Sequence, residues 1–219
     1  MLRIQNFAIL FLAFNVLITD TGLKAQQTAA KPVLDSLSIA DMQYLRKMSS
    51  MVKSMEDSLG INENNMAQKV ILVNPVSCPA IDTNIQPLKV PYADGLTTVL
   101  FTYAHQLFIA TNSALYKKNC LRAKAGSLSR PAFADSISML ESKAITNTIL
   151  IGLETGTTQD LPYPSNLINA VIDKVKRKIN SATVLYMAYE HIRKQAKDAN
   201  GISLYAGFQK FYDGLVSGK

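Results

Sequence analysis

The stretch Leu96-Thr-Thr-Val-Leu-Phe-Thr-Tyr-Ala-His-Gln-Leu-Phe-Ile109 decides the fold, because apolar residues occur on almost every side of a helix built from it. One face carries Leu96, Leu100, Tyr103 and Leu107, and the opposite face carries Phe101, His105 and Ile109. The pattern extends from Asp94 to Ala125 and stops at Gly126. A helix that is apolar all round is buried inside a protein. The sequence therefore predicts an all-α fold with this helix at its centre.

Four further stretches have the spacing of amphipathic helices. They run from about Ser38 to Leu59, from Ser129 to Glu154, from Ser165 to Ala199 and from Ile202 to Leu215. Serine stands at the start of three of them, as is typical of helix caps, and glycine follows several of their ends. We therefore predict a four- to five-helix bundle, in which the fourth helix is one continuous rod of roughly 50 Å.

Residues 61–95, between the first two predicted helices, are the least regular part of the chain. They contain four prolines that no long helix can cross, Pro75, Pro79, Pro87 and Pro91. Residues 69–73, Lys-Val-Ile-Leu-Val, have the composition of a short strand, and 88–90 are a weak candidate partner, so we expect no real sheet. The prediction is a long, irregular, Pro-rich crossover between helices 1 and 2, either tethered or functional.

The first 25 residues have the form of a secretory signal peptide. Arg3 precedes the apolar run from Phe7 to Ile18, and the small residue Ala25 stands at the expected cleavage point. The alternative is an uncleaved membrane anchor, but a spanning helix needs about 20 apolar residues and this run is shorter. We expect cleavage near Gln26 and a mature chain without a transmembrane span.

The end of this leader, Lys24-Ala-Gln-Gln27, resembles signal peptides of Gram-negative Bacteroidota. The resemblance covers the leader alone, and it implies a periplasmic or secreted protein. Residues 26–37 are polar and alanine-rich, so we expect a flexible lead-in. Residues 38–219 are then expected to form a single helical domain.

The chain has two cysteines, Cys78 and Cys120. In an exported protein a pair of cysteines is more often bridged than free, so we predict a Cys78–Cys120 disulfide that tethers the crossover. The alternative is two separate buried thiols. Neither cysteine lies in a CxxC motif or at metal-ligand spacing from a histidine, and we therefore expect no redox catalysis and no metal site.

The charge balance is basic, with a formal net charge of +7. No Asp or Glu occurs between Gly95 and Ala134. Two clusters of cations stand out: Lys117, Lys118, Arg122 and Lys124, and Lys174, Lys176, Arg177 and Lys178. They predict contact with an anionic envelope surface, lipid head groups or polysaccharide, and not with nucleic acid, which an exported protein does not meet. The alternative for the first cluster is that its cations complement the dipole at a helix end.

The first predicted helix carries a narrow seam of methionine and other apolar residues. Its members alternate spacings of three and four: Leu45, Met48, Val52, Met55 and Leu59. Such a seam packs against other helices. We name it as a candidate interaction surface for a partner or a second copy, with an ordinary packing surface as the alternative.

Only two histidines, His105 and His191, are available for chemistry. His105 lies on an apolar face near Tyr103, where it could line a cavity for haem or a small apolar ligand. The alternative is a core histidine bonded to a neighbouring polar group. His191 falls on the polar side of its helix. The sequence contains no motif for a catalytic site, for covalent haem or for phosphate binding.

The sequence thus favours an exported helical protein that acts by binding or assembly, through a protein partner or self-association. A haem-binding or small-ligand-binding bundle is the main alternative, and an anionic-surface binder is another. We expect no catalytic residues and no cofactor.

Overall fold

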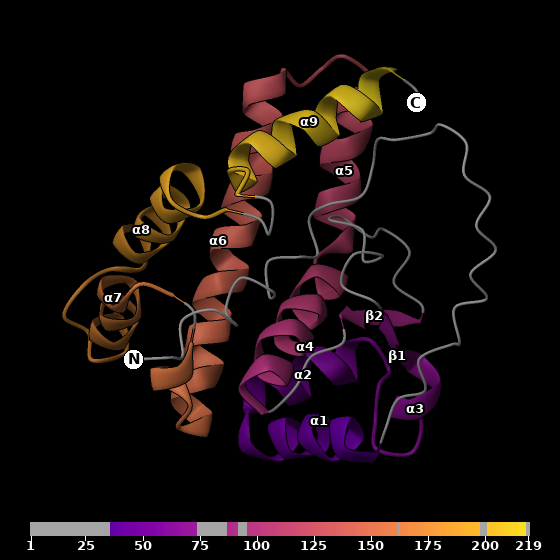
Figure 1. The fold of residues 1–219 in the computed structure, drawn as a ribbon, viewed down its shortest axis with the longest axis vertical. Coiled ribbons are helices and arrows are strands. Elements are labelled where there is room, and N and C mark those ends of the chain that lie inside the picture. The colour runs from indigo at the N-terminus through magenta and orange to yellow at the C-terminus, as the bar shows by residue number, and fades with distance from the viewer. Residues whose placement is uncertain (1–35, 74–86, 92–95, 162, 198–200, 218–219) are drawn as a thin grey trace.

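The computed structural model describes residues 36–73, 87–91, 96–161, 163–197 and 201–217. Within these ranges the protein is mostly helical, which confirms the predicted all-α fold (Figure 1). The predicted signal peptide, most of the lead-in and residues 74–86 of the crossover lie outside them. Among the described helices, none combines the length and the apolar character needed to cross a membrane.

The described residues form helices, one pair of strands and a 3-10 turn. The helices are α1 (Ser36–Met48), α2 (Ser50–Ser58), α3 (Met66–Lys69), α4 (Leu96–Thr111), α5 (Ser113–Lys124), α6 (Arg130–Thr155), α7 (Ser165–Val175), α8 (Ser181–Lys194) and α9 (Leu204–Ser217). The strands are β1 (Val70–Val73) and β2 (Leu88–Pro91), and a 3-10 turn covers Thr158–Asp160.

Helix α6 is the axis of the fold, with 26 residues. In Figure 1, α7 and α8 lie along one side of it, α4 and α5 along the other, and α9 crosses near one end. Ser129 precedes the helix, and Gly156 ends it with a φ of 73°, which glycine adopts without strain, as predicted. Buried residues occur on most sides of α6. It is therefore α6, and not the stretch from Asp94 to Ala125, that occupies the centre.

The first predicted helix is divided at Ser49, so the prediction of one continuous helix is wrong. Ser49 has extended backbone angles (φ −124°, ψ 116°), and its hydroxyl oxygen accepts a hydrogen bond from the Val52 N–H at 3.2 Å. It caps α2 in this way. The Ser49 hydroxyl also donates to Glu154 on α6. The chain therefore turns at Ser49, and both α1 and α2 pack on α4.

The second predicted helix is likewise divided, at Asn112, into α4 and α5. The Thr111 hydroxyl donates to the Leu107 carbonyl at 3.0 Å, and the Asn112 side chain donates to the Phe108 carbonyl at 2.9 Å. Side chains that bond back to the carbonyls of the preceding turn bend helices. Helix α4 is buried as expected: from Phe101 to Ala110, every side chain except His105 is buried.

The predicted rod from Ser165 to Ala199 is wrong, because α7 ends at Val175 and α8 begins at Ser181. Arg177 has a φ of 59°, in the left-handed region that a right-handed helix does not contain. Asn180 then caps α8 by accepting a hydrogen bond from the Thr183 N–H at 2.8 Å. The two helices pack on each other and on α6.

Strands β1 and β2 pair in parallel, with Val70 opposite Leu88. The two strand predictions are confirmed, but the expectation that they would form no sheet is wrong. The inward residues Val70, Leu72, Leu88 and Val90 are buried, and β2 packs on α4. Burial of these β-branched and leucine side chains stabilises the two-stranded sheet, and the sequence pattern alone does not show that burial.

Candidate functional site

Helix α5 attaches to the protein through one narrow face. Tyr116 and Ala123, about two turns apart, are fully buried on that face. Cys120 between them is half-buried. The face contacts α4, α6 and α9. Most other positions of α5 are exposed, which leaves the greater part of the helix surface to solvent.

The exposed side of α5 carries an apolar strip between two rows of cations. At about 3.6 residues per turn, the strip consists of Ala114, Leu121 and Ala125, of which Leu121 is 57% exposed. Two exposed cations lie on each side of it: Lys117 and Lys124 on one, Lys118 and Arg122 on the other. Around the helix, Leu115, which is 45% exposed, lies next to Arg122 on the side away from the apolar strip. We call these eight residues the α5 surface. It brings together all four cations of the first predicted cluster.

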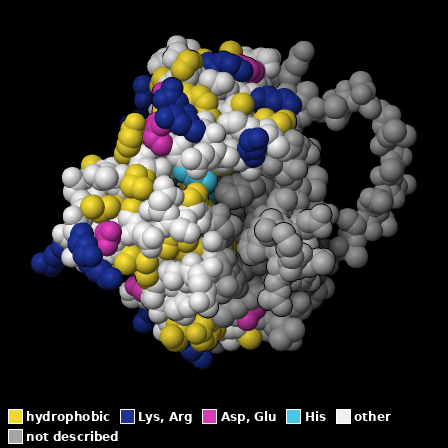
Figure 2. All heavy atoms as spheres, turned by 60° about the vertical axis from the view of Figure 1, so that its left-hand side comes forward, with side chains coloured by type: hydrophobic (Ala, Val, Ile, Leu, Met, Phe, Trp, Pro, Cys, Tyr) yellow, Lys and Arg dark blue, Asp and Glu magenta, His cyan; other side chains and the backbone are white. Residues whose placement is uncertain are grey.

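The second predicted cluster lies in the turn between α7 and α8. Lys176, Arg177 and Lys178 are exposed there, and Lys174 is half-buried. The Lys178 ammonium lies 3.6 Å from the Asp173 carboxylate. These cations thus surround a turn and do not line one face of a helix. Figure 2 shows lysine and arginine side chains in small groups over the described surface, next to exposed hydrophobic side chains and fewer carboxylates.

The methionine seam is mostly turned inward. Leu45 and Val52 are fully buried, while Met55 and Leu59 are half-buried against the core. Met48 alone among the five is exposed, at 45%. The division at Ser49 explains this, because it changes the direction of the helix in the middle of the predicted stripe. The seam therefore serves chiefly as packing for α1 and α2.

Of the two cysteines, Cys120 is described and Cys78 lies outside the described residues. Cys120 has no disulfide partner in the described part of the chain. Burial raises the pKa of its thiol, which lowers its reactivity as a nucleophile. The Cys78–Cys120 disulfide stays a prediction.

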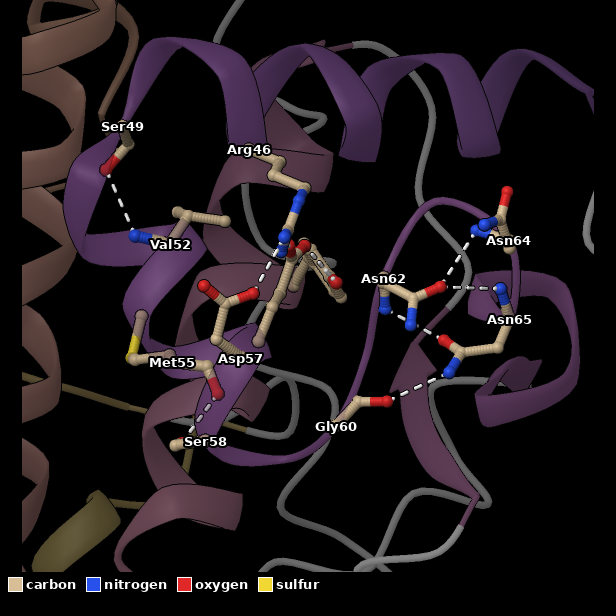
Figure 3. Close-up of polar contacts among 12 residues, drawn as sticks. Arg46, Ser49, Val52, Met55, Asp57, Ser58, Gly60, Asn62, Asn64 and Asn65 are labelled. Atoms are coloured by element: carbon tan, nitrogen blue, oxygen red, sulfur yellow. Dashed lines mark hydrogen bonds and ion pairs between the residues drawn. The ribbon is translucent and has the colours of Figure 1, made fainter.

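A buried carboxylate that the sequence analysis did not name joins α1, α2 and α4. Glu56 is fully buried, and its carboxylate accepts a hydrogen bond from the Tyr103 hydroxyl at 2.6 Å and one from the Arg46 guanidinium at 2.5 Å. Arg46 also donates to Asp57 at 2.7 Å. Figure 3 shows Arg46 reaching from α1 across to the side of α2 that carries Asp57. We call these four residues the Glu56 network.

Burial governs the proton equilibria of this network. It raises the pKa of the Glu56 carboxyl above its ordinary value, although the hydrogen bonds from Tyr103 and Arg46 act in the opposite direction. It also raises the pKa of the Tyr103 hydroxyl, and the neighbouring Glu56 charge adds to that effect. Tyr103 therefore stays protonated and donates to the carboxylate at physiological pH.

A second buried carboxylate, Glu141, joins α4, α5 and α6. Its side chain accepts a hydrogen bond from the Tyr116 hydroxyl at 2.9 Å, and its other oxygen lies 3.0 Å from Nε2 of His105. Glu141 is 3% exposed, whereas the His105 side chain is 23% exposed. Burial, followed by the charge of Glu141, raises the pKa of Tyr116 well above its ordinary value. We call these three residues the Glu141 network.

A carboxylate that orients an imidazole is also a component of nucleophilic active sites. In this protein the second carboxylate oxygen is used by Tyr116, and the three groups tie α4, α5 and α6 together. The predicted cavity between His105 and Tyr103 gains no support, because His105 bonds to Glu141 and Tyr103 bonds to Glu56. A core histidine bonded to a neighbouring polar group, the alternative, agrees with this geometry.

Both glutamates carry a signal that the sequence analysis missed. Glu56 follows Val52 by four residues, and Glu141 lies four residues from both Ile137 and Ile145. A carboxylate at such a position on an apolar stripe must be buried with its partners. The described residues contain no group of three or more His, Cys, Asp or Glu side chains that could hold a metal ion.

Comparison of the chain with protein-family models, with curated proteins and with solved structures gave no match.

Proposed function

We propose that this protein is exported and acts by binding, through the α5 surface, and not by catalysis. The observation that carries the proposal is the composition of that surface: Lys117, Lys118, Arg122 and Lys124 surround exposed Leu121 on one helix face. No carboxylate occurs between Gly95 and Ala134 to neutralise them in sequence. A surface with one sign of charge attracts partners of the opposite sign.

The internal use of the acid–base groups also supports a binding role. His105 and Tyr116 are bonded to Glu141, and Tyr103 is bonded to Glu56. These groups join helices to one another. The α5 surface, in contrast, has hydrophobic and cationic groups directed outward from a helix whose opposite face is firmly packed.

The proposal is tested by the association of the protein with isolated cell envelopes of a Gram-negative host. We expect the wild-type chain to sediment with the envelopes at low salt and to be released at about 1 M salt, where charges are screened beyond about 3 Å. The double variant Lys118→Glu/Arg122→Glu is expected to remain in the supernatant. The matched control is Lys176→Glu/Lys178→Glu, which changes the net charge equally at the α7–α8 turn and is expected to sediment like wild type.

Equal loss of sedimentation in both double variants would contradict the proposal, because it would mean that net charge alone decides the association. Export is tested in the same preparation by mass spectrometry of the N-terminus, which is expected near Gln26.

A further inference from the structure

We infer that the partner of the α5 surface is a bilayer surface rich in anionic phospholipid head groups, with Leu121 inserted between the head groups. This inference rests on the proposed function and names the partner of the same surface.

The arrangement of cations around the apolar strip carries the inference. Leu121 lies on the midline of the solvent face, and Lys117 with Lys124 and Lys118 with Arg122 flank it on both sides. A helix that lies in a membrane interface buries a central apolar face, and the long basic side chains at its edges extend upward to the phosphates. With the midline of α5 directed at a bilayer, all four cations lie at the level of the head groups.

The exposed leucines distinguish a lipid surface from other polyanions. An acidic polysaccharide offers charge but no apolar phase, so Leu121 and Leu115, 57% and 45% exposed, would remain in water on binding it. An acidic protein would need a shape that fits the convex side of a helix. Lipid head groups move laterally and can arrange themselves around the cations, so they need no preformed complementary shape. Charge and exposed apolar area together therefore favour a bilayer.

The packing of α5 supports such a role because the helix is held in advance of binding. Tyr116 donates to Glu141 at 2.9 Å, and Ala123 is fully buried. Many interfacial helices form only on the membrane and lose conformational entropy when they do. Here the helix is already formed by the core, so cations and leucine contribute to binding without that cost.

The test uses the full chain as purified and vesicle flotation. The vesicles contain either phosphatidylglycerol with phosphatidylethanolamine or phosphatidylcholine alone. We expect wild type to float with the anionic vesicles and not with the neutral ones. Lys118→Gln/Arg122→Gln should weaken partitioning by roughly 25-fold, since each cation near an anionic surface contributes about fivefold. Lys176→Gln/Lys178→Gln is the matched control and should change it by less than about threefold.

Leu121→Gln separates a bilayer from other anionic partners because it leaves the charge unchanged. We expect about tenfold weaker partitioning into anionic vesicles, since the exposed part of a leucine enters the interface. Val175→Gln is its control, because Val175 is 58% exposed beside the other cationic cluster. It should float like wild type. Circular dichroism and the urea midpoint of both variants should match wild type, which keeps a folding defect apart from a binding defect.

Three results overturn the inference and leave the proposed function intact: envelope association that depends on α5 without any flotation, binding to isolated acidic polysaccharide that Leu121→Gln does not change, or release of the protein after protease treatment of the envelopes. A failure of the charge-reversed α5 variant to differ from wild type in the envelope assay instead overturns the proposed function itself.

Discussion

The Glu56 and Glu141 networks are built alike and differ in their basic partner. In each, a buried glutamate accepts a hydrogen bond from a tyrosine hydroxyl that has no exposed surface. The second partner of Glu56 is Arg46, whose side chain is 14% exposed, and that of Glu141 is His105, whose side chain is 23% exposed. A guanidinium keeps its charge at every accessible pH, whereas an imidazole exists in neutral and charged forms.

The difference shows that the two buried carboxylates depend on their basic partners to different degrees. Arg46 gives Glu56 a permanent counter-charge and also bonds to Asp57, so the network fixes the α1–α2 pair on α4. His105 is more accessible to water, which can replace part of its bond to Glu141. We therefore expect the Glu56 network to be the more sensitive of the two to the loss of its base.

The largest expected effect is that of Arg46→Met. It removes the counter-charge and leaves Glu56 buried without it, which costs about 3 to 5 kcal/mol of unfolding free energy. Urea denaturation measures the loss. The matched control is Arg130→Met, because Arg130 pairs with Asp213 at 2.8 Å with both side chains about half exposed. Exposed pairs contribute about 0 to 1 kcal/mol.

The double variant Arg46→Met/Glu56→Leu tests the cause of that loss. If the cost comes from the unpaired buried charge, removal of Glu56 restores part of the stability that Arg46→Met takes away. A double variant less stable than the single one would assign the effect to lost packing of the Arg46 side chain instead.

The tyrosines give the next largest effect, and they compare the two networks directly. Tyr116→Phe leaves Glu141 with His105, while Tyr103→Phe leaves Glu56 with Arg46. A hydrogen bond to a charged group contributes about 1.5 to 3 kcal/mol to the free energy of unfolding. We expect the loss of unfolding free energy to lie near the upper end of this range for Tyr116→Phe and near its lower end for Tyr103→Phe. The urea midpoints of both are compared with Tyr186→Phe, since Tyr186 is 61% exposed. A larger loss for Tyr103→Phe would reverse the ranking.

Helix α6 was predicted correctly because both of its ends carry strong signals. Ser129 before Pro131 and Gly156 after the last apolar turn delimit α6 in both the prediction and the structure. The divisions at Ser49 and Asn112 were missed, because an apolar stripe that continues on both sides of a polar residue does not reveal a bend. Their side-chain hydrogen bonds to backbone groups cause the bends and depend on local geometry.

The residues of the candidate site could be predicted from sequence only in part, for a similar reason. The four cations of α5 could be named from sequence because charge density is local in the chain. The burial of Glu56 and Glu141 has a local signal in their apolar stripes, but their tyrosine partners could not be named from sequence, since Tyr103 and Tyr116 lie 47 and 25 residues away. Only the packing of α2 on α4 and of α5 on α6 shows that these residues meet. The inward direction of Leu45 and Val52 likewise depends on the bend at Ser49.

His105→Gln is expected to cost about 1 kcal/mol or less, well below Arg46→Met. The glutamine amide can donate to Glu141 in place of Nε2, and water reaches this side of the network because His105 is 23% exposed. Thermal or urea unfolding at neutral pH measures the difference. A loss as large as that of Arg46→Met would mean that the imidazole is as indispensable as the guanidinium, and the proposed contrast between the networks would be wrong.

The smallest expected effect is a pH dependence from Glu56, because the hydrogen bonds from Arg46 and Tyr103 oppose the burial that raises the pKa of this carboxyl. In the unfolded chain the carboxyl titrates near its ordinary value of 4.5, and in the folded protein it titrates at higher pH. Between the two values the folded state holds a proton that the unfolded chain has released. The contribution of Glu56 to stability is therefore complete below pH 4.5 and is lost as the pH rises through the folded pKa. Urea midpoints measured from acid to neutral pH should decline more for wild type than for Glu56→Gln, which cannot titrate. A wild-type protein that gains stability relative to the variant over this range would show that Arg46 outweighs burial and holds Glu56 ionised.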